Sequence, residues 1–278
     1  MSYQIIQVDD KYLLEESSLI IYGDSGIGKT TISRHMPNPL FLLMRGGGEH
    51  RAAPLHGSGL SIITINTKNQ LDEVLMDLKK NEPPMTPYSI IDTKKDLTEA
   101  AKELLHGTMS LGGARVKTVI IDQLTTMYNI FMGNVMTNVS RKRENLETPA
   151  QADYGQIRRS FTNFLIELNN IPNLHKVYLA LSEIDEDPDT KERYGAPMIP
   201  GKLAKEVLAF TDFVFRMHNR REVVNNKFVE YRAFQTQSEG IWLAKDSTGR
   251  LPKVIRIPSP DYNFWQEEIV KVLKGVTP

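Results

Sequence analysis

The chain has 278 residues, of which 40% are hydrophobic, and its 34 basic side chains balance its 34 acidic ones, so no overall charge draws it to nucleic acid or to an anionic membrane. The absence of cysteine excludes disulfides, thiol catalysis and thiolate metal sites. Because there is no apolar run of about 18 residues and no N-terminal signal pattern, we expect a cytoplasmic protein without a membrane span.

The first third of the chain alternates apolar runs with helical patterns. The predicted elements are a strand at 19–22, a helix at 29–36 that Pro37 ends, strands at 40–44 and 61–65, and a helix that begins at the capping box formed by Thr67 and Gln70. Prolines then interrupt residues 81–116, which we interpret as an insertion.

The rest of the chain continues this alternation and then changes character. We predict a strand at 117–122, helices from 123 and over 150–168, and a strand at 177–181. Antiparallel strands are expected at 213–217, 228–236 and 241–244, and a last helix carries Phe264, Trp265, Ile269 and Val272. The fold class is therefore α/β, a mostly parallel doubly wound sheet with antiparallel strands near the C-terminus. Its expected domains are a core at 1–258 and a C-terminal helix at 259–278.

A glycine-rich loop follows the first strand and has the spacing of a phosphate-binding loop, Gly-x-x-x-x-Gly-Lys-Thr. Its backbone N–H groups can face a β-phosphate. Lys29 has the reach for the β- and γ-oxygens, and the Thr30 hydroxyl can enter a Mg²⁺ shell. The expected nucleotide-binding residues here are Gly23, Asp24, Ser25, Gly26, Ile27, Gly28, Lys29, Thr30 and Thr31.

Asp122 ends the strand at 117–122, where a carboxylate beside the loop can hold Mg²⁺ through water. A rival is Asp92, which follows a shorter apolar run inside the insertion. A solvated strand-end aspartate with no metal role is the alternative for Asp122.

Hydrolysis also needs a group that positions or deprotonates water. Two glutamates that follow strands are candidates, Glu49 and Glu183, although each can equally be a surface residue. Ser182 can sense the γ-phosphate with its hydroxyl.

These motifs together resemble the phage-encoded P-loop ATPases of RecA-type fold, a group that includes the Sak-type single-strand annealing and recombination proteins. The matching stretches are residues 23–31, 39–43, 119–125, 153–155, 200–202, 244–246 and 249–250. The resemblance implies a RecA-like core, ATP with Mg²⁺, single-stranded DNA as ligand and a homo-oligomer, either a ring or a filament. It also implies the host cytoplasm and a phage replication or single-strand-binding protein as partner.

One departure concerns turnover. Where this group usually has an acidic residue directly after the second strand, this chain has Arg45, and Glu49 comes four positions later. ATP binding is therefore a firmer expectation than fast hydrolysis.

By resemblance, the segment 183–200 is the first DNA-binding candidate, because long loops at this edge of a sheet are often functional. Further candidates are basic clusters and tyrosines, which can also be ordinary solvated surface. They are Arg141, Lys142, Arg143, Arg158, Arg159, Arg216, Arg220, Arg221, Tyr154 and Tyr194.

Lys245 and Arg250 flank a turn and are either surface charges or, as in this fold, fingers that reach the γ-phosphate of a neighbouring subunit.

Two other functions stay open. The chain can be a nucleotide-dependent switch or motor that acts on a protein partner without binding DNA. A small-molecule kinase is a third reading, which the antiparallel strands after Thr211 fit less well.

Overall fold

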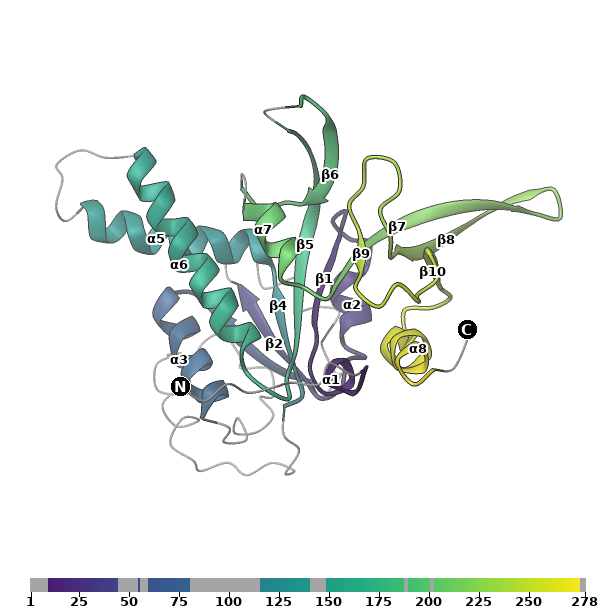
Figure 1. The fold of residues 1–278 in the computed structure, drawn as a ribbon, viewed down its shortest axis with the longest axis horizontal. Coiled ribbons are helices and arrows are strands. Elements are labelled where there is room, and N and C mark those ends of the chain that lie inside the picture. Colours follow the sequence, from purple (N-terminus) through teal and green to yellow (C-terminus); the bar gives the residue numbers. More distant parts are fainter. Residues whose placement is uncertain are drawn as a thin grey trace.

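A single mixed sheet runs through the part of the chain that the structure, a computed structural model, describes: residues 10–44, 55, 60–80, 116–140, 149–187, 190–200 and 203–275 (Figure 1). Its strands are β1 (Ser18–Gly23), β2 (Pro39–Met44), β3 (Ser61–Ile65), β4 (Thr118–Asp122), β5 (His175–Glu186), β6 (Arg193–Pro197), β7 (Phe213–Val224), β8 (Lys227–Gln235), β9 (Lys245–Asp246) and β10 (Val254–Ile257). The helices are α1 (Asp10–Glu15), α2 (Lys29–Ser33), α3 (Lys68–Lys79), α5 (Leu124–Ser140), α6 (Gln151–Asn169), α7 (Leu203–Ala209), the π-helix η2 (Trp265–Val270) and α8 (Lys271–Leu273).

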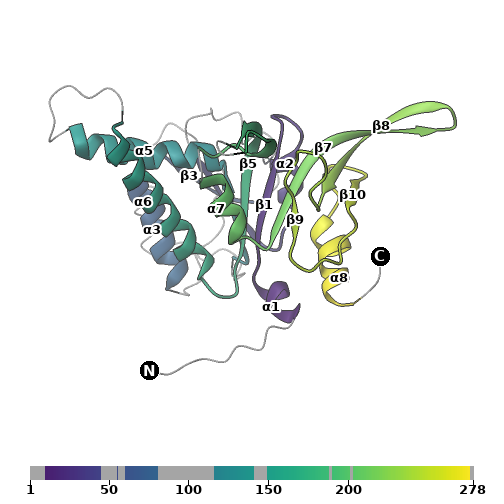
Figure 2. The same ribbon diagram turned by 45° about the horizontal axis from the view of Figure 1, so that its top comes forward.

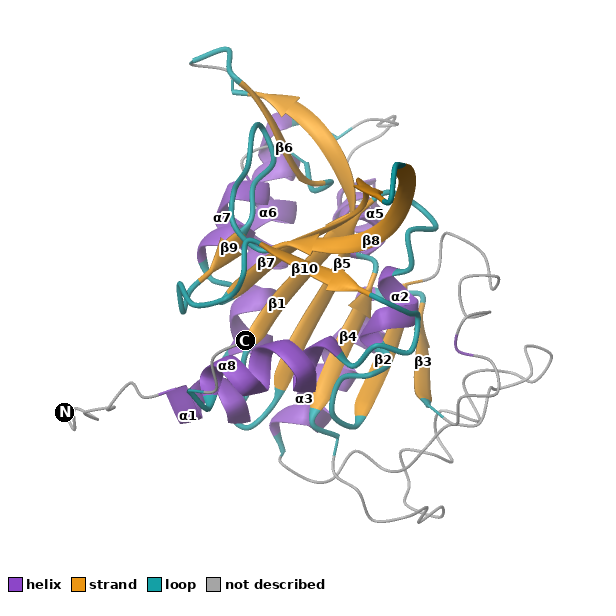
Figure 3. Ribbon diagram, turned by 90° about the vertical axis from the view of Figure 1, so that its right-hand side faces the viewer, coloured by secondary structure: helices purple, strands orange, loops and turns teal. Residues whose placement is uncertain are grey.

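The strand order is β10-β8-β7-β1-β5-β4-β2-β3, with β6 paired to β5 and β9 paired to β7. The five strands from β1 to β3 in this order run parallel, as Figure 3 shows. Toward the other edge, β7 pairs with β8, and β8 with β10, in antiparallel fashion. The predicted fold class, a mostly parallel α/β sheet with antiparallel strands near the C-terminus, is confirmed.

Helices cover both faces of this sheet (Figures 1 and 2). One apolar cluster joins the strands to α3, α5, α6 and α7, and a second joins the opposite face to α2, η2 and α8. Successive side chains of β1 point to opposite faces of the sheet, which explains why there are two clusters. Ile20 and Tyr22 belong to the first cluster, and Leu19 and Ile21 belong to the second. None of the described helices combines the length and apolarity that crossing a membrane needs.

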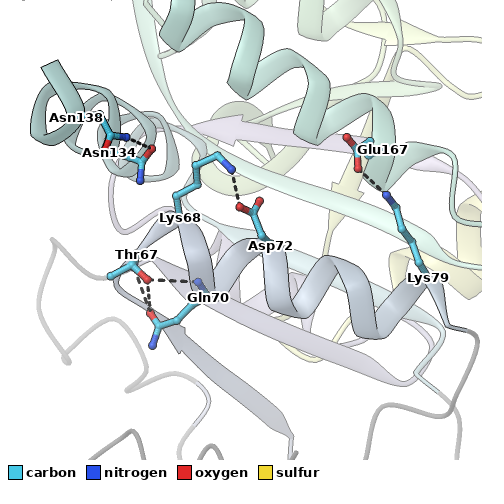
Figure 4. Close-up of polar contacts among 8 residues, drawn as sticks. All are labelled: Thr67, Lys68, Gln70, Asp72, Lys79, Asn134, Asn138 and Glu167. Carbon is cyan, nitrogen blue, oxygen red and sulfur yellow. Dashed lines mark hydrogen bonds and ion pairs between the residues drawn. The ribbon is translucent and has the colours of Figure 1, made fainter.

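Helix α3 begins as the sequence predicts (Figure 4). Thr67 Oγ1 accepts a hydrogen bond from Gln70 N at 3.3 Å, and Gln70 Oε1 accepts one from Thr67 N at 3.1 Å. This capping box satisfies two backbone N–H groups that the first turn leaves without helical partners. An ion pair between Lys79 and Glu167 then ties the other end of α3 to α6.

Several predicted boundaries were wrong. The helix after the glycine-rich loop ends at Ser33 rather than at residue 36. Residues 213–217 form a strand that is antiparallel to β9 at 213–214 and to β8 from Arg216 onward, but on its other side it pairs with β1 in parallel. Residues 241–244 contain a turn and an isolated bridge, and the strand there is β9. Strand β10 was not predicted.

The largest difference lies at the segment 183–200, which was expected to be a loop. Strand β5 does not end near residue 181 but continues to Glu186 and pairs with β6, from Ser182 opposite Pro197 to Glu186 opposite Arg193. A β-hairpin therefore projects beyond the sheet at this edge (Figure 1). Most of the predicted insertion at 81–116 lies outside the described residues.

A buried histidine lies at the start of β5, at the edge of the sheet remote from the glycine-rich loop. His175 is 3% exposed, packs against Trp265 with ring centroids 4.7 Å apart, and shares a 3.0 Å hydrogen bond with Ser17 Oγ. Burial, with the nearby charges of Lys176 and Lys117, lowers the pKa of His175 to about 4.

Acid should therefore weaken the fold through this one residue. Between pH 6.5 and about 4, the unfolded chain binds a proton at His175 that the native state excludes, so the free energy of unfolding falls as the pH is lowered. In the wild type the free energy of unfolding should fall between pH 7.5 and pH 5, and we expect this fall to be about 2 kcal/mol smaller in a His175→Gln variant. Urea denaturation at both pH values measures this. Ser17→Ala, which leaves the ring buried, should keep the wild-type difference; an unchanged difference in His175→Gln would contradict the assignment.

Candidate functional site

The glycine-rich loop connects β1 to α2 and adopts a conformation that two glycines make possible. Gly26 has a φ of 75° and Gly28 a φ of 107°, both in the region that side chains disfavour. Ile27 N–H closes a turn onto Asp24 O at 3.4 Å. The loop therefore folds back over the end of β1.

Gly23 is required for a different reason. A Cβ atom at this position would lie 2.2 Å from the carbonyl oxygen of Met217, on the neighbouring strand β7. No side chain fits against a backbone atom at that distance. The first glycine of the motif thus allows the close approach of two strands.

Lys29 lies across the loop rather than in solvent. Its Nζ donates hydrogen bonds of 2.8 Å to Gly23 O and Asp24 O, and the residue is only 9% exposed. The ammonium group is therefore held directly above the turn, where a phosphate bound by the loop would meet it.

Thr30 and Asp122 meet at the same edge of the sheet. Thr30 Oγ1 donates a 2.7 Å hydrogen bond to Asp122 Oδ2, although 92 residues separate them in sequence. Strand β5 lies between β1 and β4. Asp122, at the end of β4, therefore reaches the loop from two strands away from β1. A hydroxyl and a carboxylate suit Mg²⁺, which usually takes one or two protein oxygens and completes its shell with phosphates and water. Within the described residues no larger group of metal-ligating side chains competes for the ion.

The end of β5 contributes two further polar groups. Ser182 Oγ donates a 2.5 Å hydrogen bond to Asp24 Oδ1, which links the loop to the projecting hairpin. Glu183 is half-buried, and its pKa is raised by that burial and by Asp185, against a lowering by the hydrogen bond from Ile199 N–H. A carboxylate of raised pKa holds protons more readily, as a general base does.

The structure describes two of the remaining candidates, Lys245 and Arg250, and not the other three positions. Glu49, Arg45 and the rival Asp92 lie outside the described residues. Lys245 Nζ donates a 2.7 Å hydrogen bond to Thr211 O and weaker ones to carbonyls at the end of α7, beside the start of β7. Arg250 follows the next turn. Lys245 is thus bonded to backbone carbonyls beside the start of β7.

The DNA-binding candidates are scattered and partly neutralised. Arg158 pairs with Glu206 from within α6, Arg220 pairs with Glu239, and Arg216 stacks on Trp242 with its guanidinium carbon 3.5 Å from the ring centroid. Tyr154 belongs to α6 rather than to a loop, and Tyr194 donates to Asp185 at 3.1 Å. The residues Arg141, Lys142 and Arg143 lie outside the described part.

The hairpin of β5 and β6 is acidic, which does not suit a polyanion. Two basic residues, Lys191 and Arg193, stand among a larger acidic set. Among the described residues that set is Glu183, Asp185, Glu186, Asp187 and Glu192. The charge of this segment therefore does not favour the predicted contact with DNA.

One residue near the loop was not among the predictions. A Cβ on Gly28 would lie 3.1 Å from Nη1 of Arg232, which belongs to β8. No motif marks Arg232 in the sequence. The strand was predicted, but neither its neighbours nor its face could be read from one chain.

A family model described as AAA domain matches residues 15–248. Among solved structures, the crystal structure of the RadB recombinase is similar, with 12% sequence identity, a TM-score of 0.38, and coverage of 83% of this chain and 90% of that chain. The comparison with curated proteins gives no match.

Proposed function

The chain belongs to the AAA domain family, and from this premise we propose that it binds and hydrolyses ATP with Mg²⁺ and acts on single-stranded DNA as an oligomer. The observation that carries the nucleotide part is the convergence of Lys29, Thr30 and Asp122 on one glycine-rich loop. Lys29 and Thr30 belong to helix α2 and Asp122 to strand β4, and a turn needed only for folding would not require all three.

In this proposal the loop residues 23–31 cradle the phosphates with backbone N–H groups. Lys29 leaves the carbonyls of Gly23 and Asp24 and neutralises the β- and γ-oxygens. Thr30 and Asp122 hold Mg²⁺, which would stabilise the charge that develops on the transferred phosphoryl group.

Hydrolysis needs a residue that orients the attacking water, and two glutamates remain candidates. Glu183 has the raised pKa of a proton acceptor and lies one residue beyond Ser182, which contacts the loop. Glu49 is the second candidate, from its place after the second strand.

The DNA part of the proposal rests on the resemblance to Sak-type phage ATPases and on a surface away from the acidic hairpin. The distal end of β7 and β8 projects far from the sheet (Figure 1). At its tip Phe228 is 81% exposed, beside Lys227 and close to Arg221. An exposed aromatic ring with neighbouring cations is what stacks on the bases of a single strand.

The same resemblance extends the proposal to the assembly and its setting. Residues 1–258 would form the ATPase core, with 259–278 as a helical appendage, in a ring or filament. There Lys245 and Arg250 would face the nucleotide of a neighbour. A phage replication or single-strand-binding protein would be the partner in the host cytoplasm.

A second candidate function has one observation in its favour. The acidic hairpin of β5 and β6 lies next to the nucleotide site, and its exposed Ile184 offers an apolar contact. A nucleotide-dependent switch that docks a basic protein partner there would need no DNA.

The deciding experiment measures ATP hydrolysis and binding of a fluorescent oligothymidylate in the same samples of the full chain. We expect DNA to stimulate hydrolysis and ATP to strengthen DNA binding. Phe228→Ala should weaken DNA binding about tenfold without changing ATP affinity, whereas Tyr12→Ala, which removes an exposed tyrosine from α1, should leave both affinities unchanged. ATP binding without any effect of DNA would favour the protein-partner switch, and a chain that binds no ATP would overturn both.

A further inference from the structure

Arg232 and Arg216 are the arginines of the β7–β8 arm that form no ion pair with a described carboxylate, and Arg216 stacks on Trp242 instead. Arg220 pairs with Glu239, Arg221 with Glu230, and Arg256 on the adjacent strand β10 with Glu222. In the described part of the chain, no carboxylate forms an ion pair with Arg232. Its guanidinium lies instead over the glycine-rich loop, 3.1 Å from the position that a Gly28 side chain would take.

The sheet register puts Arg232 there for a clear reason. Side chains alternate between faces along a strand, and directly opposed residues of paired strands share a face. Arg232 therefore lies on the same face of the sheet as Phe234 and as Ile257, which is its own partner on β10. Phe234 in turn pairs with Met217 on β7. Phe234, Met217 and Ile257 belong to the cluster that packs against α2, so this face carries the loop and its helix.

The strand order separates Arg232 from the metal ligands. Asp122 approaches the loop from β4, on one side of β1, whereas Arg232 approaches across β7 from the other side. A phosphate chain on the loop would thus have Mg²⁺ with the γ-phosphate on the β4 side. Its α- and β-phosphates would face β8.

We propose that Arg232 is a nucleotide-binding residue that holds the α- and β-phosphates from the side opposite the metal, an inference that rests on the proposed nucleotide site. An arginine contacts phosphate oxygens through a rigid fork of N–H donors. Because ADP and ATP share these two phosphates, Arg232 should bind both to the same extent. It would contribute ground-state affinity and leave the chemical step unchanged.

The test is isothermal titration calorimetry of the full chain with MgADP and with a non-hydrolysable ATP analogue. We expect Arg232→Ala to raise both dissociation constants about tenfold, with their ratio unchanged. Arg232→Lys should lose less, because it keeps the charge. The matched control is Arg256→Ala, which removes an arginine from the opposite face of the same strands, where it stacks on Tyr231. That variant should bind both nucleotides as the wild type does.

The outcomes separate this inference from the proposed function. Equal affinities in Arg232→Ala and the wild type would overturn it while leaving the nucleotide site intact. Loss of affinity for the ATP analogue alone, or a lowered kcat at saturating ATP with unchanged affinities, would also overturn it, because either result assigns Arg232 to the γ-phosphate. If the wild type itself binds neither nucleotide, the proposed function fails first. Thermal unfolding of each variant without nucleotide shows that folding is unaffected, as expected for an exposed side chain on β8.

Discussion

Replacing Lys29 with alanine is expected to abolish tight binding of ATP. The ammonium group is already held above the loop by Gly23 O and Asp24 O, so little ordering is needed before it contacts phosphate. Two charge-assisted hydrogen bonds are worth about 3 kcal/mol or more together, which corresponds to at least about a hundredfold in the dissociation constant. Titration calorimetry with the non-hydrolysable ATP analogue measures the loss.

The control for this change is Lys79→Ala. Lys79 forms an ion pair with Glu167 and lies at the end of α3, away from the loop. Its removal should leave nucleotide affinity unchanged and alter stability by less than about 1 kcal/mol, as is usual for an exposed pair. Wild-type affinity in Lys29→Ala would remove the assignment of residues 23–31 as a phosphate-binding loop.

Replacing Gly23 with alanine is expected to destabilise the whole fold, in addition to the site. The added methyl group would lie 2.2 Å from Met217 O, so β1 and β7 must move apart within a sheet that packs on both faces. Overpacking of this kind costs about 3 kcal/mol. The free energy of unfolding from urea denaturation, measured without nucleotide, gives the value.

Gly155→Ala adds the same methyl group where there is room. Gly155 lies in α6, and outside its own helix backbone no described atom lies within 4 Å of its added Cβ, so the change should stabilise the protein by about 0.5–1 kcal/mol. If Gly23→Ala unfolds at the same urea concentration as the wild type, the close approach of β1 and β7 is wrong.

Local signals made much of this fold predictable. The loop at 23–30 is defined by residues that are adjacent in sequence, and the α3 cap by residues three apart, so no knowledge of the sheet was needed. The prediction of Asp122 as a strand-end carboxylate used local pattern too. Its contact with Thr30 follows once the strands are parallel, because their carboxyl ends share one edge.

What could not be predicted depends on pairing between distant strands. The turn of the β5–β6 hairpin is polar, and the sequence of 183–200 has charged residues and three prolines, which favour a loop by local criteria. Pairing of Ser182 with Pro197 and its neighbours overrides that preference. Arg232 was missed for the same reason, since its proximity to Gly28 requires the positions of β7, β8 and the loop together.

The close approach at Gly23 also affects how the first glycine of a phosphate-loop motif is interpreted when related sequences are compared. A chain of this fold that lost nucleotide binding would be free to change Lys29, yet the carbonyl of Met217 would still forbid a side chain at Gly23. Gly23 would therefore be retained after nucleotide binding is lost. In a survey of such sequences, a glycine at this position indicates the shared fold, and only the lysine of the loop indicates nucleotide binding.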